Sequence, residues 1–240
     1  MRVLYFIYQL CVFLPLFLVV TILCALITML GSKFGNGDFW GYYPGRIWSR
    51  VVCFLALIPV EVRGRENIDK NTSYVFVANH QGSFDIFLIY GYLNHNFKWM
   101  MKKSLRNLPF VGRACQDAGH IFVDDSGATG IRRTIEQAKD TLRHGMSLVV
   151  FPEGSRTLDG KMHRFKKGAY QLAYDINLPV VPLTIEGPYK VLKRGTKVMS
   201  PHKMILTIHK PIPLESRDES EVMRLLKESR EVIAASLGES

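Results

Sequence analysis

The 240-residue sequence has little cysteine and lacks the short motifs that identify common cofactor sites. Its four cysteines show no paired spacing, so neither a disulfide framework nor a cysteine-based zinc site is expected. There is no P-loop, no dinucleotide fingerprint and no H-E-x-x-H motif, which argues against nucleotide-dependent and zinc-peptidase chemistry. Internal repeats and low-complexity segments are also missing. The cysteines are Cys11, Cys24, Cys53 and Cys115, and three of them sit in apolar stretches.

Charge is absent from residues 3–30, and this run is long enough to cross a bilayer, which takes about 20 apolar residues. A signal peptide is the alternative, but the run exceeds the roughly 7–15 residues of a signal core and no small-residue cleavage site follows. The aromatic cluster F-W-G-Y-Y-P at residues 39–44 is typical of a membrane–water boundary. A second apolar stretch at residues 51–60 is short for a span. It could lie in the interface or return as half of a re-entrant hairpin.

The rest of the chain is basic, because residues 61–240 hold 27 Lys and Arg against 20 Asp and Glu. Lys33, Arg46 and Arg50 follow the first apolar run, so the positive-inside rule puts what comes after it in the cytoplasm. We therefore expect a membrane-anchoring apolar helical segment over residues 1–60 and a separate α/β domain over residues 61–240.

Short β-like runs alternate with helical periods after residue 62, which predicts an α/β fold. We expect a mixed, largely parallel sheet with flanking helices, preceded by the N-terminal membrane-associated helical segment. In open α/β sheets, ligands collect beyond the carboxyl ends of the strands. The predicted strands are 74–78, 97–101, 120–123, 147–151, 180–185 and 204–209, and the predicted helices are 83–92, 131–144, 168–176 and 222–237.

The segment N-H-Q-G-S-F-D at residues 79–85 directly follows a predicted strand. On a continuous helix His80 and Asp85 would lie about 140° apart, so they meet only if the chain turns between them. Gly82 permits such a turn, and Ser83 is a candidate N-cap that would place Asp85 in the first helical turn. A carboxylate on one imidazole nitrogen leaves the other free to accept a proton, which would make His80 a general base. Alternatively, both side chains only satisfy the backbone of the turn.

The segment F-P-E-G-S-R at residues 151–156 also follows a strand. Arg156 offers a planar fork suited to phosphate, and Gly154 allows a close approach of the backbone. Further cations follow it closely, so the segment predicts a phosphate pocket or, alternatively, a solvated basic loop. These cations are Arg164, Lys166 and Lys167, in a loop that also contains His163.

Four ordered blocks resemble the glycerolipid acyltransferase family, and within it the 1-acylglycerol-3-phosphate O-acyltransferases. Residues 79–85 match the family's N-H-x4-D motif, and G-H-I-F-V-D at residues 119–124 resembles its second block. Residues 151–156 match the third block, and L-P-V-V-P-L at residues 178–183 matches the fourth. The N-H-x4-D pattern alone is weak, whereas four blocks in order are highly specific.

The resemblance implies transfer of an acyl group from a thioester to the free sn-2 hydroxyl of 1-acylglycerol-3-phosphate (lysophosphatidic acid), which makes phosphatidic acid. His80 would be the general base, and Asp85 would orient it and stabilise its charge. The third block would bind the substrate's phosphate through Glu153, Gly154, Ser155 and Arg156. We expect Arg156 to supply the charge and Glu153 to organise the site. No acyl-enzyme, cofactor or metal is implied; the donor would be acyl-CoA or an acyl-carrier-protein thioester.

One departure from the family bears on the acceptor. The second block commonly has an Arg after its acidic residue, but Asp125 stands there in this sequence. Lys102, Lys103 or Arg132 are candidate replacements, and we favour Lys102 as a substrate-binding residue. Gly82, often a polar residue in the family, is a minor change. The same acyl transfer to another lysolipid acceptor therefore stays open.

Two other classes of function are weaker alternatives. A non-enzymatic basic peripheral membrane or nucleic-acid-binding protein would use the run Lys190, Lys193, Arg194 and Lys197. Nucleic acid is not an expected partner, since aromatic residues do not interleave with these basic ones, and membrane lipids explain the charge more simply. A metallohydrolase would need paired ligands, which five further histidines do not offer. These are His120, His144, His163, His202 and His209.

Overall fold

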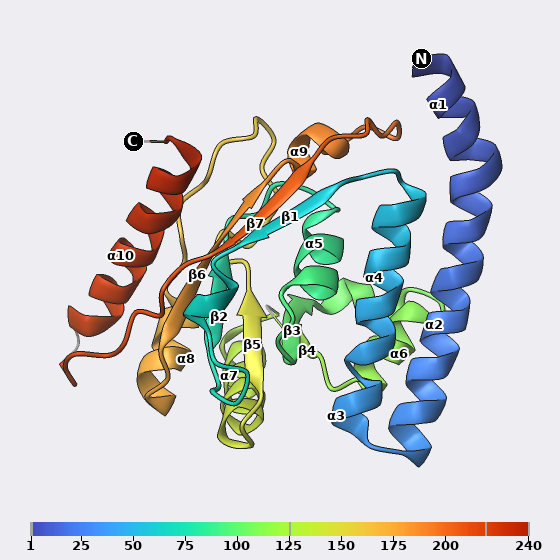
Figure 1. Ribbon diagram of the computed structural model, residues 1–240. Coiled ribbons are helices and arrows are strands. Elements are labelled where there is room, and N and C mark those ends of the chain that lie inside the picture. Colours follow the sequence, from blue (N-terminus) through green and yellow to red (C-terminus); the bar gives the residue numbers. More distant parts are fainter. Residues whose placement is uncertain (1, 125, 219, 240) are drawn as a thin grey trace.

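The computed structural model describes residues 2–124, 126–218 and 220–239, and in this part of the chain a seven-stranded sheet carries helices on both faces (Figure 1). The strands are β1 (Val60–Arg63), β2 (Val75–Ala78), β3 (Phe97–Lys102), β4 (Ile121–Val123), β5 (Ser147–Val150), β6 (Val180–Glu186) and β7 (Met204–Ile208). The α-helices are α1 (Arg2–Tyr8), α2 (Leu14–Phe34), α3 (Gly37–Trp40), α4 (Tyr43–Leu55), α5 (Asp85–Tyr92), α6 (Val111–Asp117), α7 (Ala128–Arg143), α8 (Gly168–Ile176), α9 (Pro188–Val191) and α10 (Ser220–Leu237). A π-helical turn spans Gln9–Phe13, and 3₁₀ turns span Arg65–Asn67 and Lys103–Asn107.

The strand order is β1-β7-β6-β2-β5-β3-β4, and every neighbouring pair is parallel except β6 and β7. The strands from β6 to β4 in this order therefore run in one direction, and their carboxyl ends meet at one edge of the sheet. The predicted mixed, largely parallel sheet is confirmed. This shared edge is where the residues that follow β2, β3 and β5 come together.

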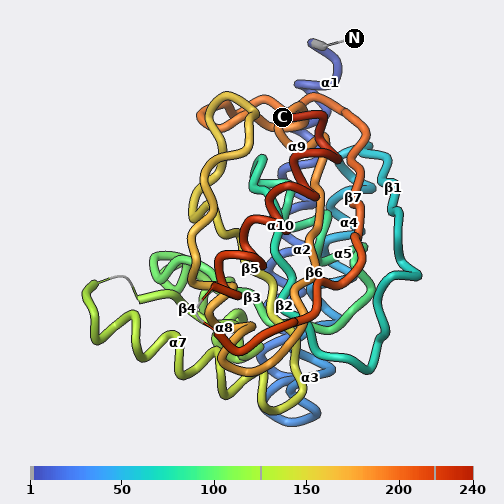
Figure 2. Tube along the Cα trace, turned by 90° about the vertical axis from the view of Figure 1, so that its left-hand side faces the viewer, coloured from blue at the N-terminus to red at the C-terminus, as the bar shows by residue number. Residues whose placement is uncertain are grey.

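Both faces of the sheet are covered, which explains why its central strands read as continuous apolar runs. Phe76 and Leu183 face a core shared with α4 and α5, whereas Val75, Val77 and Leu148 face a core shared with α7, α8 and α10. In Figure 1, α8 and α10 lie on one side of the sheet and α5, α4 and α2 lie on the other, with α2 outermost. Figure 2 shows α10 lying along β6.

The N-terminal apolar run forms one long helix interrupted by the π-helical turn. Its residues Val3–Phe34 have a mean hydropathy of 3.0 over the best window, of which 11% is buried, so the helix is long and apolar enough to cross a membrane. After the α3 turn, α4 returns beside α2 (Figure 1). Trp48 donates its indole N–H to Thr21 at 2.9 Å, and the Tyr5 hydroxyl donates to the Ala56 carbonyl at 2.9 Å. Residues 51–55 form the end of α4, and the chain enters β1 at Val60. The placement of residues 51–60 in the membrane interface or in a re-entrant hairpin stays a prediction.

The hairpin is joined to the sheet through α4 and α5. At Gly45 a Cβ atom would lie 2.5 Å from the Tyr90 ring, so only glycine permits this approach. The Tyr90 hydroxyl donates to the Gly41 carbonyl at 2.9 Å, and Val52 and Cys53 of α4 are fully buried in the same core as β2. The first 60 residues thus share a core with the α/β part. A functional division of the chain at residue 60 stays a prediction.

Every strand and helix predicted from the sequence is present, with ends shifted by three residues or fewer. The prediction missed β1 and α6, along with the short α3 and α9. β1 alternates Glu61 and Arg63 with two valines at the end of the sheet, where one face stays exposed, so it lacks the long apolar run of a central strand.

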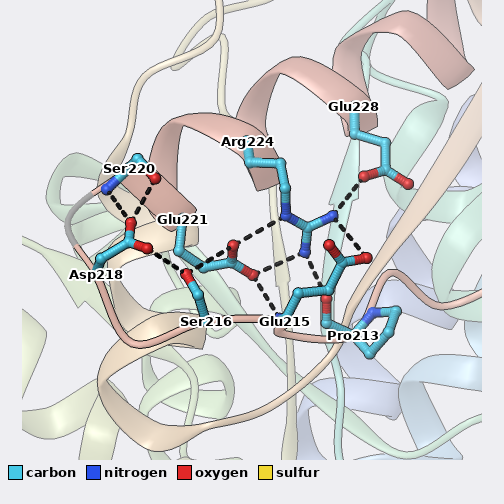
Figure 3. A network of polar contacts seen from close by, with 8 residues as sticks. All are labelled: Pro213, Glu215, Ser216, Asp218, Ser220, Glu221, Arg224 and Glu228. Atoms are coloured by element: carbon cyan, nitrogen blue, oxygen red, sulfur yellow. Dashed lines mark hydrogen bonds and ion pairs between the residues drawn. The ribbon is translucent and has the colours of Figure 1, made fainter.

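A polar network holds the start of α10 (Figure 3). The Glu221 carboxylate is 2% exposed, accepts from the Glu215 amide at 2.8 Å, and pairs with Arg224 at 2.7 Å. Arg224 also pairs with Glu228 at 2.7 Å and donates to the Pro213 carbonyl at 2.7 Å. The Arg224 guanidinium lowers the pKa of Glu221 to about 2. The folded state therefore holds this carboxylate in its charged form.

This lowered pKa predicts an acid-dependent loss of stability. A free glutamate titrates near pH 4.3, so Glu221 stabilises the fold fully above about pH 5 and progressively less as the pH falls toward 2. We expect the difference in Tm between wild type and Glu221→Gln, measured in detergent, to be largest at pH 6 and to shrink toward pH 2. Glu231→Gln, an exposed site on the same helix, is the control and should change the Tm little. A difference for Glu221→Gln that is constant from pH 6 to pH 2 would contradict this linkage.

Candidate active site

Asn79 fixes the point at which the chain leaves β2. Its side chain is buried; Nδ2 donates to the Ile185 carbonyl at 2.9 Å, and Oδ1 accepts from the Ile185 amide at 2.8 Å. Because β6 lies beside β2, the carboxamide continues the pairing of the two strands beyond the end of β2. The sequence contained this signal only as a polar residue at the end of an apolar strand, and Asn79 was not among the predicted site residues.

His80 and Asp85 meet across the turn that follows. His80 Nδ1 lies 2.7 Å from Asp85 Oδ2, and both carboxylate oxygens also lie 3.0 Å from the Gly82 amide nitrogen. Since an ionised carboxylate only accepts hydrogen bonds, this contact favours the tautomer with its proton on Nδ1 and with Nε2 as the acceptor. The predicted turn between His80 and Asp85 is thus present. Asp85 is fully buried, and this burial raises its pKa while the hydrogen bonds from His80 and Gly82 oppose the rise.

The His80 ring rests on an aromatic column. It stacks on Phe151 with 3.9 Å between ring centroids and 10° between ring planes, and Phe151 stacks on Trp99 at 5.8 Å and 19°. Phe151 comes directly after β5, and Trp99 lies in the neighbouring strand β3, where it pairs with Val149 of β5. The column restricts rotation of the imidazole, so the Nε2 direction is fixed by both Asp85 and Phe151. The His80 side chain remains 16% exposed.

The expected N-cap role of Ser83 is wrong. Helix α5 begins at Asp85, with Phe84 at its N-cap position and no side-chain cap hydrogen bond. The Asp85 carboxylate binds the Gly82 amide instead, and Ser83 Oγ accepts a hydrogen bond from Arg156 Nη1. Ser83 therefore joins the turn after β2 to the loop after β5.

Glu153 ties three backbone segments together. Its side chain is buried; Oε1 accepts from the His80 amide at 2.8 Å, and Oε2 accepts from the His163 amide at 2.9 Å. Burial raises the pKa of Glu153, and the two amide hydrogen bonds oppose this rise. With both oxygens bound to the main chain, Glu153 holds the active-site turn in place, and the Thr157 amide adds a hydrogen bond to the His80 carbonyl at 2.9 Å.

Gly154 and Ser155 follow Glu153 in this loop, and Gly154 is exposed. Gly154 has φ +75°, and its amide donates to the Phe151 carbonyl at 3.0 Å, which closes a tight turn. A Cβ atom there would lie 2.9 Å from Lys166 Nζ, so the ammonium group sits against the glycine. Ser155 and Arg156 are half-buried. The loop therefore presents a small residue, a hydroxyl and two cations beside His80.

The family model described as "Acyltransferase" matches residues 59–186, which is more than half of the chain. The chain belongs to this acyltransferase family. The match begins just before β1 and ends with β6, so it includes His80, Asp85 and the loop from Phe151 to Arg156.

Similar proteins carry a common name. A Chlamydomonas reinhardtii protein named 1-acyl-sn-glycerol-3-phosphate acyltransferase is 31% identical over 180 residues, covering 74% of this chain and 53% of that protein. A protein of the same name from Saccharomyces cerevisiae is 29% identical over 231 residues, covering 92% of this chain and 71% of that protein. The chain spans about half the length of the first curated relatives it matches.

A solved structure extends the similarity to the whole fold. The crystal structure of PlsC, the 1-acyl-sn-glycerophosphate (LPA) acyltransferase of Thermotoga maritima, superposes with a TM-score of 0.83 and 26% sequence identity. The superposition covers 99% of this chain and 95% of that chain. It therefore includes the N-terminal hairpin as well as the sheet of this acyltransferase-family chain.

The three cations proposed to replace the missing Arg of the second block have different surroundings. Lys102 is exposed at the carboxyl end of β3, on the edge that carries His80, but within the described residues no hydrogen bond or ion pair joins it to the loop at 153–156. Lys103 is paired with Asp124 at 2.9 Å, and Arg132 is exposed on α7. Asp125 lies outside the described residues. Lys102 as a substrate-binding residue stays a prediction.

His120, in the second motif block, has a different environment from His80. His120 is buried; its Nδ1 accepts from the Trp99 amide at 3.2 Å, and burial lowers its pKa to about 3. It is therefore a neutral ring that holds the backbone beneath the aromatic column. Among the described residues, no group of three His, Cys, Asp or Glu side chains lies close enough together to hold a metal ion.

A cavity of about 270 Å³ lies at the opposite, amino edge of the sheet. Its lining includes the buried Lys98, 3.4 Å from Asp38, together with Gly119 and Met146, which precede β4 and β5. Burial lowers the pKa of Lys98. This cavity contains none of the predicted site residues.

The Asn79 contacts predict a large stability effect at the edge of the active site. Asn79→Ala leaves the buried amide and carbonyl of Ile185 without partners, which costs about 2–4 kcal/mol of unfolding free energy. We expect the urea midpoint in detergent to fall accordingly. Asn107→Ala, at an exposed position, serves as the control. A loss below about 0.5 kcal/mol in Asn79→Ala would show that water replaces the carboxamide, and the anchoring role would be rejected.

Proposed function

We propose that the protein transfers an acyl group from an acyl thioester to the sn-2 hydroxyl of 1-acylglycerol-3-phosphate and makes phosphatidic acid. The observation that carries this proposal is the 2.7 Å pair of His80 Nδ1 and Asp85, which leaves the other ring nitrogen, Nε2, available as a proton acceptor next to a cationic loop. Membership of the acyltransferase family and the names of the similar proteins support it.

In this reaction His80 acts as the general base. Nε2 takes the proton of the acceptor hydroxyl while the hydroxyl oxygen attacks the thioester carbonyl. The new C–O bond forms, the C–S bond breaks, and the proton passes from His80 to the departing thiolate. Asp85 stabilises the transient imidazolium, because it is a buried carboxylate whose one ion-pair partner among the described residues is His80. No acyl-enzyme is needed for this sequence of steps.

The loop after β5 would bind the phosphate of the acceptor. Arg156 supplies a charged fork, while the Gly154 turn and the Ser155 hydroxyl allow a close approach. Glu153 organises this loop without facing the substrate, since both its oxygens accept from backbone amides. Lys102, on the same edge of the sheet, would add a cation further out. The donor would be acyl-CoA or an acyl-carrier-protein thioester, and no cofactor is required.

The apolar hairpin would hold the protein on the membrane that contains its lysolipid substrate. With Lys33, Arg46 and Arg50 after the first apolar run, we propose that the α/β part lies on the cytoplasmic face. Protease added to sealed, right-side-out vesicles should leave the α/β part intact, and its digestion there would overturn this orientation.

The proposed general base predicts a specific loss of activity. His80→Ala should lower kcat for lysophosphatidic acid and an acyl-CoA by about 10²–10⁴-fold with little change in KM, because only proton transfer is removed. His144→Ala replaces an exposed histidine on the far edge of the sheet and should keep wild-type kinetics. Full activity of His80→Ala would reject the mechanism. Equal or better turnover of a lysolipid without a phosphomonoester would shift the proposal to another acceptor.

A further inference from the structure

A basic loop lies beside the active-site turn and has no part in the steps above. It consists of residues 190–197, from the end of α9 into the connection to β7, and carries Lys190, Lys193, Arg194 and Lys197. The loop extends at the top of Figure 1, on the side of the N-terminal helix. In the sequence this run suggested only binding to an anionic surface.

The backbone at the start of the loop packs directly on the catalytic turn. A Cβ atom at Gly82 would lie 3.1 Å from the Pro188 carbonyl oxygen and 3.4 Å from that of Leu192. Glycine at this position, which differs from the family pattern, therefore lets the segment approach the His80 turn closely. Arg194 Nη1 then donates to the Arg156 carbonyl at 2.9 Å. The Arg194 guanidinium thus lies beside the residue that carries the proposed phosphate-binding charge.

The conformation of the loop is fixed at its tip and at both ends. The Thr196 amide donates to the Lys193 carbonyl at 3.1 Å across Gly195, which has φ +87°, so the tip is a tight turn. The Ser200 amide donates to the Val191 carbonyl at 2.8 Å, and Val191 is buried. A cation on such a loop is presented in a defined place.

The far end of the loop is held by the N-terminal apolar helix. Gln9 Nε2 donates to the Lys197 carbonyl at 2.8 Å, and Gln9 Oε1 accepts from the Met199 amide at 3.0 Å. Gln9 is one of the few polar residues in the apolar run and begins the π-helical turn, a distortion that is frequent at functional sites. Its carboxamide is therefore used to position the loop.

The charge of Arg194 is not neutralised by the protein. Within the described residues, no carboxylate lies within ion-pair distance of Arg194, although Arg224 on α10 pairs with several glutamates. One of the five N–H groups of Arg194 is used for the Arg156 carbonyl. The Arg194 guanidinium lies against the main chain of Arg156 and has N–H donors to spare, so it can bind a dianionic oxygen ligand such as a phosphomonoester.

We propose that Arg194 is a second phosphate-binding residue for the acceptor and that Gln9 positions it from the apolar helix. This assignment rests on the proposed function. It supplies a cation that the second motif block lacks. The phosphate would lie between Arg156 and Arg194, while the hydroxyl of the same molecule reaches His80.

Kinetics of Arg194→Gln test this assignment in the full-length protein in detergent micelles. At saturating acyl-CoA we expect KM for lysophosphatidic acid to rise about 10- to 100-fold, the range for losing a charged hydrogen bond, while kcat changes less than about threefold. Arg194→Lys should recover part of the loss. Lys193→Gln is the matched control, because its ammonium lies over the Tyr189 ring at 5.5 Å, and it should change KM less than about twofold.

The role of Gln9 is tested by a double-mutant cycle. Gln9→Leu should raise KM for lysophosphatidic acid by a smaller factor. In Gln9→Leu/Arg194→Gln it should add nothing further, since Gln9 acts only by positioning the loop that carries the Arg194 guanidinium. An unchanged KM in Arg194→Gln, or equal increases in Arg194→Gln and Lys193→Gln, would overturn the assignment and leave the proposed function standing. If the two substitutions raised KM independently, so that their factors multiplied in the double variant, Gln9 would have no part in the assignment. If wild type transferred no acyl group to any lysolipid, the proposed function would fail and this assignment with it.

Discussion

The hydrogen bond between His80 and Asp85 requires a bent chain, and the surrounding structure holds that bend in place. Two residues five apart meet only when the chain between them is bent, and a bent segment at the end of a strand needs partners for its backbone. Asn79 holds its entry through Ile185, and Glu153 and Thr157 hold the His80 backbone from the loop after β5. The parallel arrangement of β6, β2 and β5 puts these partners side by side.

The site also combines a buried negative charge with two positive charges on its solvent-facing side. Asp85 is fully buried, so its interaction with the imidazole is strong in its low-dielectric surroundings, and the Phe151 ring covers one face of His80. Arg156 and Arg194 lie at the solvent-facing side, where a phosphate can reach them. The N-terminal hairpin shares the core of the sheet through Gly45 and Tyr90 and reaches the basic loop through Gln9. The apolar hairpin and the candidate active site are thus joined in one structure.

Much of the fold and of the candidate site was predictable from the sequence. The features that were missed depend on contacts between residues far apart in the chain. Apolar runs such as 147–150 and the end of α8 at Asn177, in a left-handed conformation, have local signals, and the N-H-x4-D spacing indicated a turn. The role of Ser83 was mispredicted because its partner, Arg156, is 73 residues away. Gln9 and Lys197 are 188 residues apart, so nothing local could relate them, and β1 gains its place only by pairing with β7.

The protonation of the His80 ring is the most direct test of its role as the general base oriented by Asp85. In protein labelled with ¹⁵N-histidine and studied at alkaline pH, with His80 assigned by its loss in His80→Ala, the two ring nitrogens have distinct chemical shifts. We predict a protonated Nδ1 and an unprotonated Nε2, because the Asp85 carboxylate accepts from Nδ1. A protonated Nε2 with a bare Nδ1 would mean that Asp85 does not orient the ring, and the proposed general base would be contradicted.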